Sequence, residues 1–124
     1  MTEQEFEEGI AAVKEVYPGT SLLPGTASER PLRVAPITIP AAFWGGGITR
    51  LLVVFNLAML ETARPAGYLG PEWKLSTGAP AMNAQPAFVY GEAWQTFSWN
   101  FEWSPRLGVL QVVEAYLGRF GEQR

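Results

Sequence analysis

The hydrophobic positions near the start of the chain are spaced three or four residues apart. This spacing predicts an amphipathic helix over Glu3–Val16, with charged side chains on its remaining faces. The apolar stripe is formed by Phe6, Ile10, Val13 and Tyr17. Thr2 is suited to the N-cap position, and Pro18 with Gly19 ends the helix.

A second helical stripe lies near the end of the chain. Ser104 is a favourable N-cap and Pro105 a favourable first helical residue, so we expect this helix to begin there and to end at Gly121. Its apolar positions are Leu107, Leu110, Val113, Leu117 and Phe120.

The segment between the two helices has the patterns of strands. Ser21–Gly25 is a short edge-strand candidate, and Pro31–Ile39 alternates in polarity but contains Pro36, which predicts an edge or bulged strand. Ile48–Leu57 is the clearest strand, because its run of β-branched and aromatic residues predicts a central strand covered on both faces. The next residues, Ala58–Glu61, fit a strand end or a helical turn.

The rest of the middle region is rich in proline, glycine and aromatic residues. Arg64–Leu75 predicts an irregular strand at the sheet edge, and Ser76–Ala87 predicts a long loop. Phe88–Trp103 fits either a strand or a helix. The sequence therefore predicts one α+β domain over residues 1–124, with an N-terminal helix, an antiparallel four-stranded meander, a long loop and a C-terminal helix.

The composition of the chain limits the classes of partner that we expect. Its 124 residues are 48% hydrophobic and 17% charged, with a net charge of −3. The basic residues are scattered, so we expect no nucleic-acid binding, and no apolar run is long enough for a transmembrane helix. We expect a cytoplasmic protein that uses no cofactor; the composition leaves its oligomeric state open.

The residue types that most enzymes need are scarce. The sequence has no cysteine, no histidine and no aspartate, so it offers no thiolate nucleophile and no imidazole base, and we expect neither a catalytic centre nor a metal site. Glutamates that could act in pairs outside the first helix are Glu61, Glu72, Glu92, Glu102 and Glu114. Glu92 and Glu102 flank the aromatic segment, and Glu92 is also a candidate binding residue. Gly45–Gly47 lacks the Lys-Ser/Thr of a phosphate loop and predicts a turn.

The tryptophans are candidates for a binding surface. Trp44, Trp73 and Trp99 could present a binding face, whereas Trp94 and Trp103 fit a hydrophobic core. Three of the five tryptophans fall between Trp94 and Pro105, and we expect this stretch to anchor the fold.

The second half of the chain resembles a bacterial branch of the ubiquitin-conjugating enzyme (UBC) superfamily. The residues that carry this resemblance are Arg64-Pro65, Gly67-Tyr68, Trp73-Lys74-Leu75, Thr77-Gly78, Ala79-Pro80, Gly91, Trp94-Gln95, Phe97-Ser98-Trp99 and Trp103-Ser104-Pro105. The resemblance implies a helix, a four-stranded meander, a catalytic-loop region and a closing helix. Its motifs cover about residues 64 to 120.

The sequence lacks the catalytic residues of the family that it resembles. Active members hold ubiquitin as a thioester on a cysteine that follows a His-Pro-Asn motif, and this sequence has neither cysteine nor histidine. Met82 and Asn83 lie in the corresponding loop and are candidate binding residues. A cysteine replaced by alanine would leave the same pattern, at Ala81, Ala84, Ala87 or Ala93.

Two functional hypotheses follow, beside a third, a glutamate-dependent enzyme or lectin-like binder, which requires Glu92 and Glu102 to converge with exposed tryptophans in one cleft. The resemblance implies a noncatalytic module that binds a ubiquitin-like protein or an activating-enzyme-like protein, in a bacterial conjugation or antiphage defence system. The acidic charge and the lack of catalytic residues fit equally an immunity or adaptor protein that masks a toxin or effector.

Overall fold

The fold is described from a computed structural model, which describes residues 1–40, 45–74, 77–78, 84–97 and 101–122. In chain order the elements are α1 (Glu3–Val16), β1 (Ser21–Leu22), β2 (Glu29–Thr38), β3 (Ile48–Asn56), the 3-10 turn η1 (Leu57–Met59), β4 (Ala66–Leu69), β5 (Gln85–Val89), β6 (Glu92–Thr96) and α2 (Val109–Glu122). The α+β class and the two terminal helices are confirmed. The sheet has six strands, two more than the predicted meander.

Helix α1 has the predicted bounds and the predicted cap. The amide of Glu5 donates to Thr2 Oγ1 at 3.1 Å, and the amide of Thr2 donates to Glu5 Oε1 at 2.8 Å. Together these bonds form a capping box, which satisfies two backbone donors at the helix start. The stripe residues Phe6, Ile10 and Val13 are all buried, so the period-3.6 pattern identified the face that packs on the sheet.

The sheet is antiparallel throughout, in the order β1-β2-β3-β4-β6-β5. Strand β2 pairs with both β1 and β3, so it is not an edge strand. The other predicted alternative, a bulged strand, is the one observed, with its irregularity between Val34 and Ile37. This irregularity contains the cis peptide bond Ala35–Pro36. The prediction of an edge strand over Arg64–Leu75 is wrong, because β4 pairs with β3 on one side and with β6 on the other.

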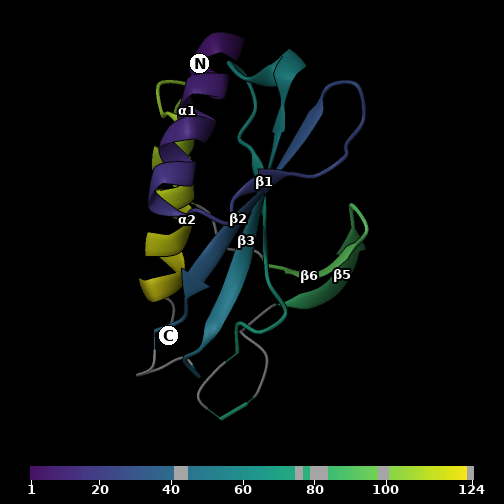
Figure 1. Ribbon diagram of the computed structural model, residues 1–124, viewed down its shortest axis with the longest axis vertical. Coiled ribbons are helices and arrows are strands. Elements are labelled where there is room, and N and C mark those ends of the chain that lie inside the picture. The colour runs from purple at the N-terminus through teal and green to yellow at the C-terminus, as the bar shows by residue number, and fades with distance from the viewer. Residues whose placement is uncertain (41–44, 75–76, 79–83, 98–100, 123–124) are drawn as a thin grey trace.

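Strand β3 is buried on both faces, as its sequence predicts. Leu51, Val53 and Phe55 join the hydrophobic core beneath the helices. Leu52 points to the opposite face and is also fully buried, although it is not part of that core. Figure 1 shows the two helices on one side of the sheet and the β5–β6 hairpin on the other.

The aromatic segment is neither one strand nor a helix. It begins as a hairpin in which Val89 pairs with Glu92 across a two-residue turn, and both turn residues, Tyr90 and Gly91, have positive φ. This geometry is that of the tight turns that join twisted antiparallel strands. The predicted loop over Ser76–Ala87 is correspondingly shorter at its end, since β5 begins at Gln85.

Helix α2 begins four residues later than predicted. Ser104 and Pro105 form a turn, in which the amide of Leu107 donates to the Ser104 carbonyl at 3.0 Å. The helix starts after Gly108, whose amide donates to Gln111 Oε1 at 2.7 Å. Packing explains the later start, because Val109 lies against α1 at Gly9, where a Cβ atom would come within 2.6 Å of Val109 Cγ2.

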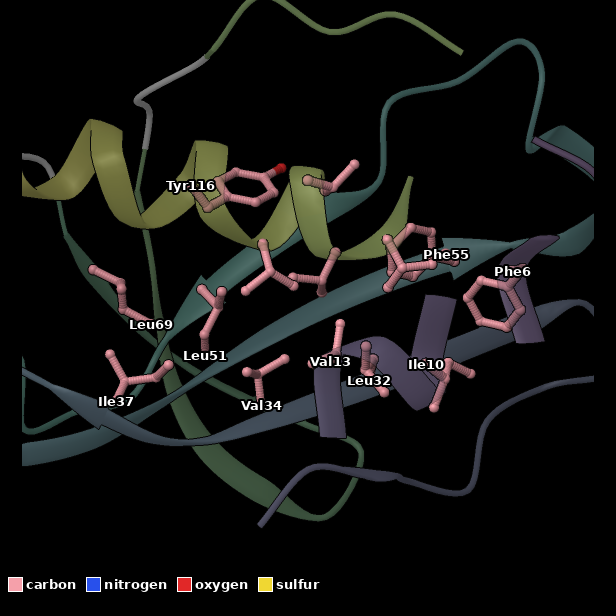
Figure 2. Close-up of a cluster of buried hydrophobic side chains, with 14 of the residues drawn as sticks. Phe6, Ile10, Val13, Leu32, Val34, Ile37, Leu51, Phe55, Leu69 and Tyr116 are labelled. Atoms are coloured by element: carbon pink, nitrogen blue, oxygen red, sulfur yellow. The ribbon is translucent and has the colours of Figure 1, made fainter. Parts of the chain in front are cut away.

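The helix-side core is closed by Tyr116 of α2 (Figure 2). Its ring makes edge contacts with Phe97 and Phe101 of the aromatic segment, at centroid distances of 5.8 and 4.7 Å. The hydroxyl donates to the Pro65 carbonyl just before β4. Only a glycine fits beneath this ring, because a Cβ atom on Gly67 would lie 2.7 Å from the Tyr116 ring carbon Cζ.

The burial of Tyr116 gives a pH-dependent prediction. Burial raises the pKa of the Tyr116 phenol to about 12, with Arg64 acting weakly in the opposite direction. Between pH 10 and 12 an unfolded tyrosine loses its proton while the folded one keeps it, so the free energy of unfolding falls as the pH rises. For Tyr116 alone the loss is about 2–3 kcal/mol.

The Tyr116→Phe variant tests this prediction by urea unfolding from pH 7 to 11.5. We expect it to be less stable at pH 7 by about 1 kcal/mol, because the hydrogen bond to Pro65 is lost. We also expect a shallower fall in stability above pH 10 than in the parent protein. Parallel pH profiles for the two proteins would contradict the assignment.

Candidate functional site

A shallow pocket of about 240 Å³ lies where the β5–β6 hairpin meets the turn after β4. We call it the hairpin pocket, and its lining residues are Pro71, Lys74, Ala84, Pro86, Trp94 and Gln95. Here the described end of the predicted long loop meets the aromatic segment. Lys74 is the one charged residue of the lining, so the pocket combines apolar walls with a single cation.

Gln95 holds the floor of this pocket in place. Its side chain is buried, and Nε2 donates to the carbonyls of Gly70 at 2.8 Å and Trp73 at 2.9 Å. The turn is closed on itself by the amide of Trp73, which donates to the Gly70 carbonyl at 3.2 Å. One amide side chain on β6 therefore fixes the backbone that carries Lys74.

A second polar contact supports the same turn. Thr49 Oγ1 donates to Glu72 Oε1 at 2.7 Å, and the amide of Gly70 donates to the Arg50 carbonyl at 2.8 Å. The chain approaches β3 so closely that a Cβ atom on Gly70 would lie 2.0 Å from Thr49 Oγ1. Glycine is needed at this position for steric reasons.

The hairpin is fastened across the helix-free face of the sheet by charged side chains. Glu92 of β6 accepts from Arg33 Nε of β2 at 3.1 Å and lies 3.9 Å from Arg50 Nε of β3. Arg50 also donates to the Ala93 carbonyl, and its guanidinium lies 4.5 Å from the Trp94 ring centre. Strand β6 does not pair with β2 or β3, so these contacts place the hairpin over them rather than beside them.

The turn of the hairpin is anchored by Tyr90. Burial, together with the neighbouring Glu29 carboxylate of β2, raises the pKa of its phenol to about 12. Tyr90 has a φ of 52°, a conformation that costs a non-glycine residue free energy. The contact with Glu29 helps to offset this cost and keeps the turn against the sheet.

Two of the six predicted binding residues lie in the described part of the chain. Trp73 is only 2% exposed and belongs to the core, so the exposed face expected of it is not formed. Glu92 is tied to two arginines on the helix-free face. The other four predictions, for Trp44, Met82, Asn83 and Trp99, fall outside the described residues.

The prediction of core positions for the remaining tryptophans fares better. Trp94 is 1% exposed, but it lies outside the helix-side core and packs under the Arg50 guanidinium. Trp103 is half-buried and packs against the helix-side core. The stretch therefore contributes to both faces of the sheet.

The glutamates flanking the aromatic segment have different surroundings. Glu92 is partly buried between arginine side chains, whereas Glu102 is exposed. In the described ranges no three histidine, cysteine or acidic side chains come together in a way that could hold a metal ion. No helix in the described part of the chain has the length and apolarity needed to cross a membrane.

Sequence reasoning missed the residues that build the pocket. Lys74 and Gln95 belong to the motifs that carry the resemblance, but neither they nor Pro86 were predicted as binding residues. The available signal was Gly91 between two short apolar runs, since glycine readily adopts the positive φ that a tight hairpin turn requires. A hairpin there would have brought Pro86 opposite Gln95, as observed.

No family model, no curated protein and no solved structure matches this chain.

The role of Gln95 can be tested with Gln95→Leu. This substitution removes both donors to the Gly70 and Trp73 carbonyls, and we expect it to lower the free energy of unfolding by about 2–4 kcal/mol. Urea unfolding measures the loss, and amide exchange should speed up at Trp73.

Gln85→Leu is the matched control, on the exposed side of the same hairpin. We expect it to change stability by less than about 0.5 kcal/mol. Equal effects of the two substitutions would show that Gln95 does not hold the turn.

Proposed function

We propose that the chain is a noncatalytic UBC-like domain that works by binding another protein. The observation that carries the proposal is the element order: an N-terminal helix, an antiparallel meander and a closing helix, with both helices on one sheet face. This is the order implied by the motifs between residues 64 and 120. The β5–β6 hairpin is an addition to the predicted meander.

Binding rather than catalysis follows from the side chains that the sequence provides. A thioester needs a thiol, and the sequence contains no cysteine. It has no histidine either, and Glu92, the partly buried acid beside the aromatic segment, is committed to Arg33 and Arg50. A protein built this way acts through its surface.

The partner class follows from the resemblance. We propose a ubiquitin-like protein or an activating-enzyme-like protein, within a bacterial conjugation system or an antiphage defence system. The surface offers exposed apolar side chains for such contacts, among them Phe88 at 74% and Ile48 at 62% exposure. Single exposed apolar residues are common on monomers, so the side chains alone do not identify the partner.

Biolayer interferometry of the immobilised chain tests the proposal. The probes are a panel of bacterial ubiquitin-like and activating-enzyme-like proteins, and we expect saturable binding of at least one of them. An unrelated protein matched in size and net charge to that probe is the control for nonspecific attraction. Absence of binding to every ubiquitin-like and activating-enzyme-like probe would rule out the proposed function.

A further inference from the structure

The two edges of the sheet differ in a way that bears on binding. Strand β1 closes one edge with only two residues, whereas β5 closes the other with five. Proteins commonly protect exposed edges by keeping them short or by placing charges on them. Strand β5, with the sequence QPAFV, carries no charge.

The backbone of β5 offers hydrogen-bonding groups on its free side. The Gln85 carbonyl faces β6, where it accepts from Thr96 Oγ1 at 3.4 Å. Backbone groups alternate in direction along a strand, so those of Pro86 and Phe88 point away from β6. Pro86 has no N–H, which leaves Phe88 as the outward donor and both residues as outward acceptors.

Two apolar side chains of β5 lie beside this edge. Pro86 and Phe88 alternate with Ala87 and therefore share one face of the hairpin, where they pair with Gln95 and Ala93. Pro86 and Gln95 also line the hairpin pocket, so the surface runs from the exposed Phe88 ring into that pocket. At about 240 Å³ the pocket is smaller than the roughly 300–1,000 Å³ typical of small-molecule sites.

The segment that forms this edge and part of the pocket carries one charged side chain, which is positive. Between residues 73 and 91 the only charged residue is Lys74, which is exposed at the pocket. Within the described ranges Lys74 has no acidic group within ion-pair distance. Glu72 accepts from Thr49, and Glu92 is held by Arg33 and Arg50.

We propose that β5 and the hairpin pocket bind an extended peptide segment in which an acidic residue lies two positions after an apolar one, so that both side chains share one face of the added strand. The segment adds a strand by pairing with Phe88, its apolar side chain enters the pocket, and its carboxylate lies against Lys74. Strand addition supplies backbone hydrogen bonds, and the pocket with its cation supplies the side-chain preference. The inference rests on the proposed function, because it names the surface that such a binding domain uses.

The test titrates the ¹⁵N-labelled chain with the synthetic peptide TVTLTET and with its twin TVTLTKT. We expect TVTLTET to shift the amide signals of Phe88 and Lys74 most, and to slow hydrogen exchange of the Phe88 amide at least tenfold. The lysine twin should bind at least threefold more weakly, as should TVTLTET to Lys74→Gln, since an exposed ion pair contributes modestly. Phe88→Ala should also weaken binding, because the apolar surface is lost.

Ile48→Ala is the matched control, since it removes an equally exposed apolar side chain on β3. It should bind the peptide like the parent chain, and the spectrum of each free variant reports whether it is folded. Equal binding of the two peptides, no binding, or no slowing at Phe88 would overturn the proposal. A homodimer that Phe88→Ala makes monomeric would also overturn it, because a second copy would then occupy the edge.

The two proposals can fail separately. A ubiquitin-like probe that binds the parent, Phe88→Ala and Lys74→Gln chains equally would leave the function standing and remove the docking site. Peptide binding without any binding of ubiquitin-like or activating-enzyme-like probes would do the reverse.

Discussion

The fold depends on covering β3 from both sides. Leu51, Leu52 and Val53 follow one another and are all fully buried, although neighbouring side chains of a strand point to opposite faces. Two helices cover one face, and the other needs a separate cover. The β5–β6 hairpin supplies it: after a single pair with β4, Leu69 with Gln95, the hairpin turns back over β2 and β3.

A cover made of one hairpin has little apolar surface of its own, so polar contacts hold it in place. Glu92 is bound by arginines from two strands, and Arg50 stacks on Trp94, which buries the indole under a cation. Such partly exposed charge pairs are individually weak. Their effect here comes from joining strands that do not pair in the sheet, together with the buried amide of Gln95.

The elements that sequence predicted well are those determined by local pattern. Helix α1 combines a capping box with an apolar stripe, and β3 is a long β-branched run; neither depends on distant residues for its identity. The start of α2 was predicted too early because Ser104 and Pro105 have the local sequence of a helix cap. The observed start is instead set by the contact of Val109 with Gly9, about 100 residues earlier in the chain. The position of β4 in the sheet was wrongly predicted for the same reason, because the sequence of β4 does not determine that β6 pairs with it.

The candidate site was harder to predict than the fold. Trp73 looked like a binding residue by type, but its position after a turn clamped by Gln95 places it in the core. The hairpin pocket consists of residues with no chemical signature, brought together only when the hairpin crosses the sheet. Side-chain type alone therefore pointed away from it.

The aromatic stretch has a more specific role than its density of rings suggests. Trp94 faces the hairpin side, whereas Phe97 and Phe101 contact Tyr116 on the helix side. The chain thus passes from one face of the sheet to the other within a few residues and packs an aromatic ring on each. Because both layers are tied to this stretch, the hairpin cannot move without disturbing the packing around α2. The apolar, weakly charged edge is anchored on both faces of the sheet in this way, and such an anchor would lower the entropic cost of the proposed binding of another chain.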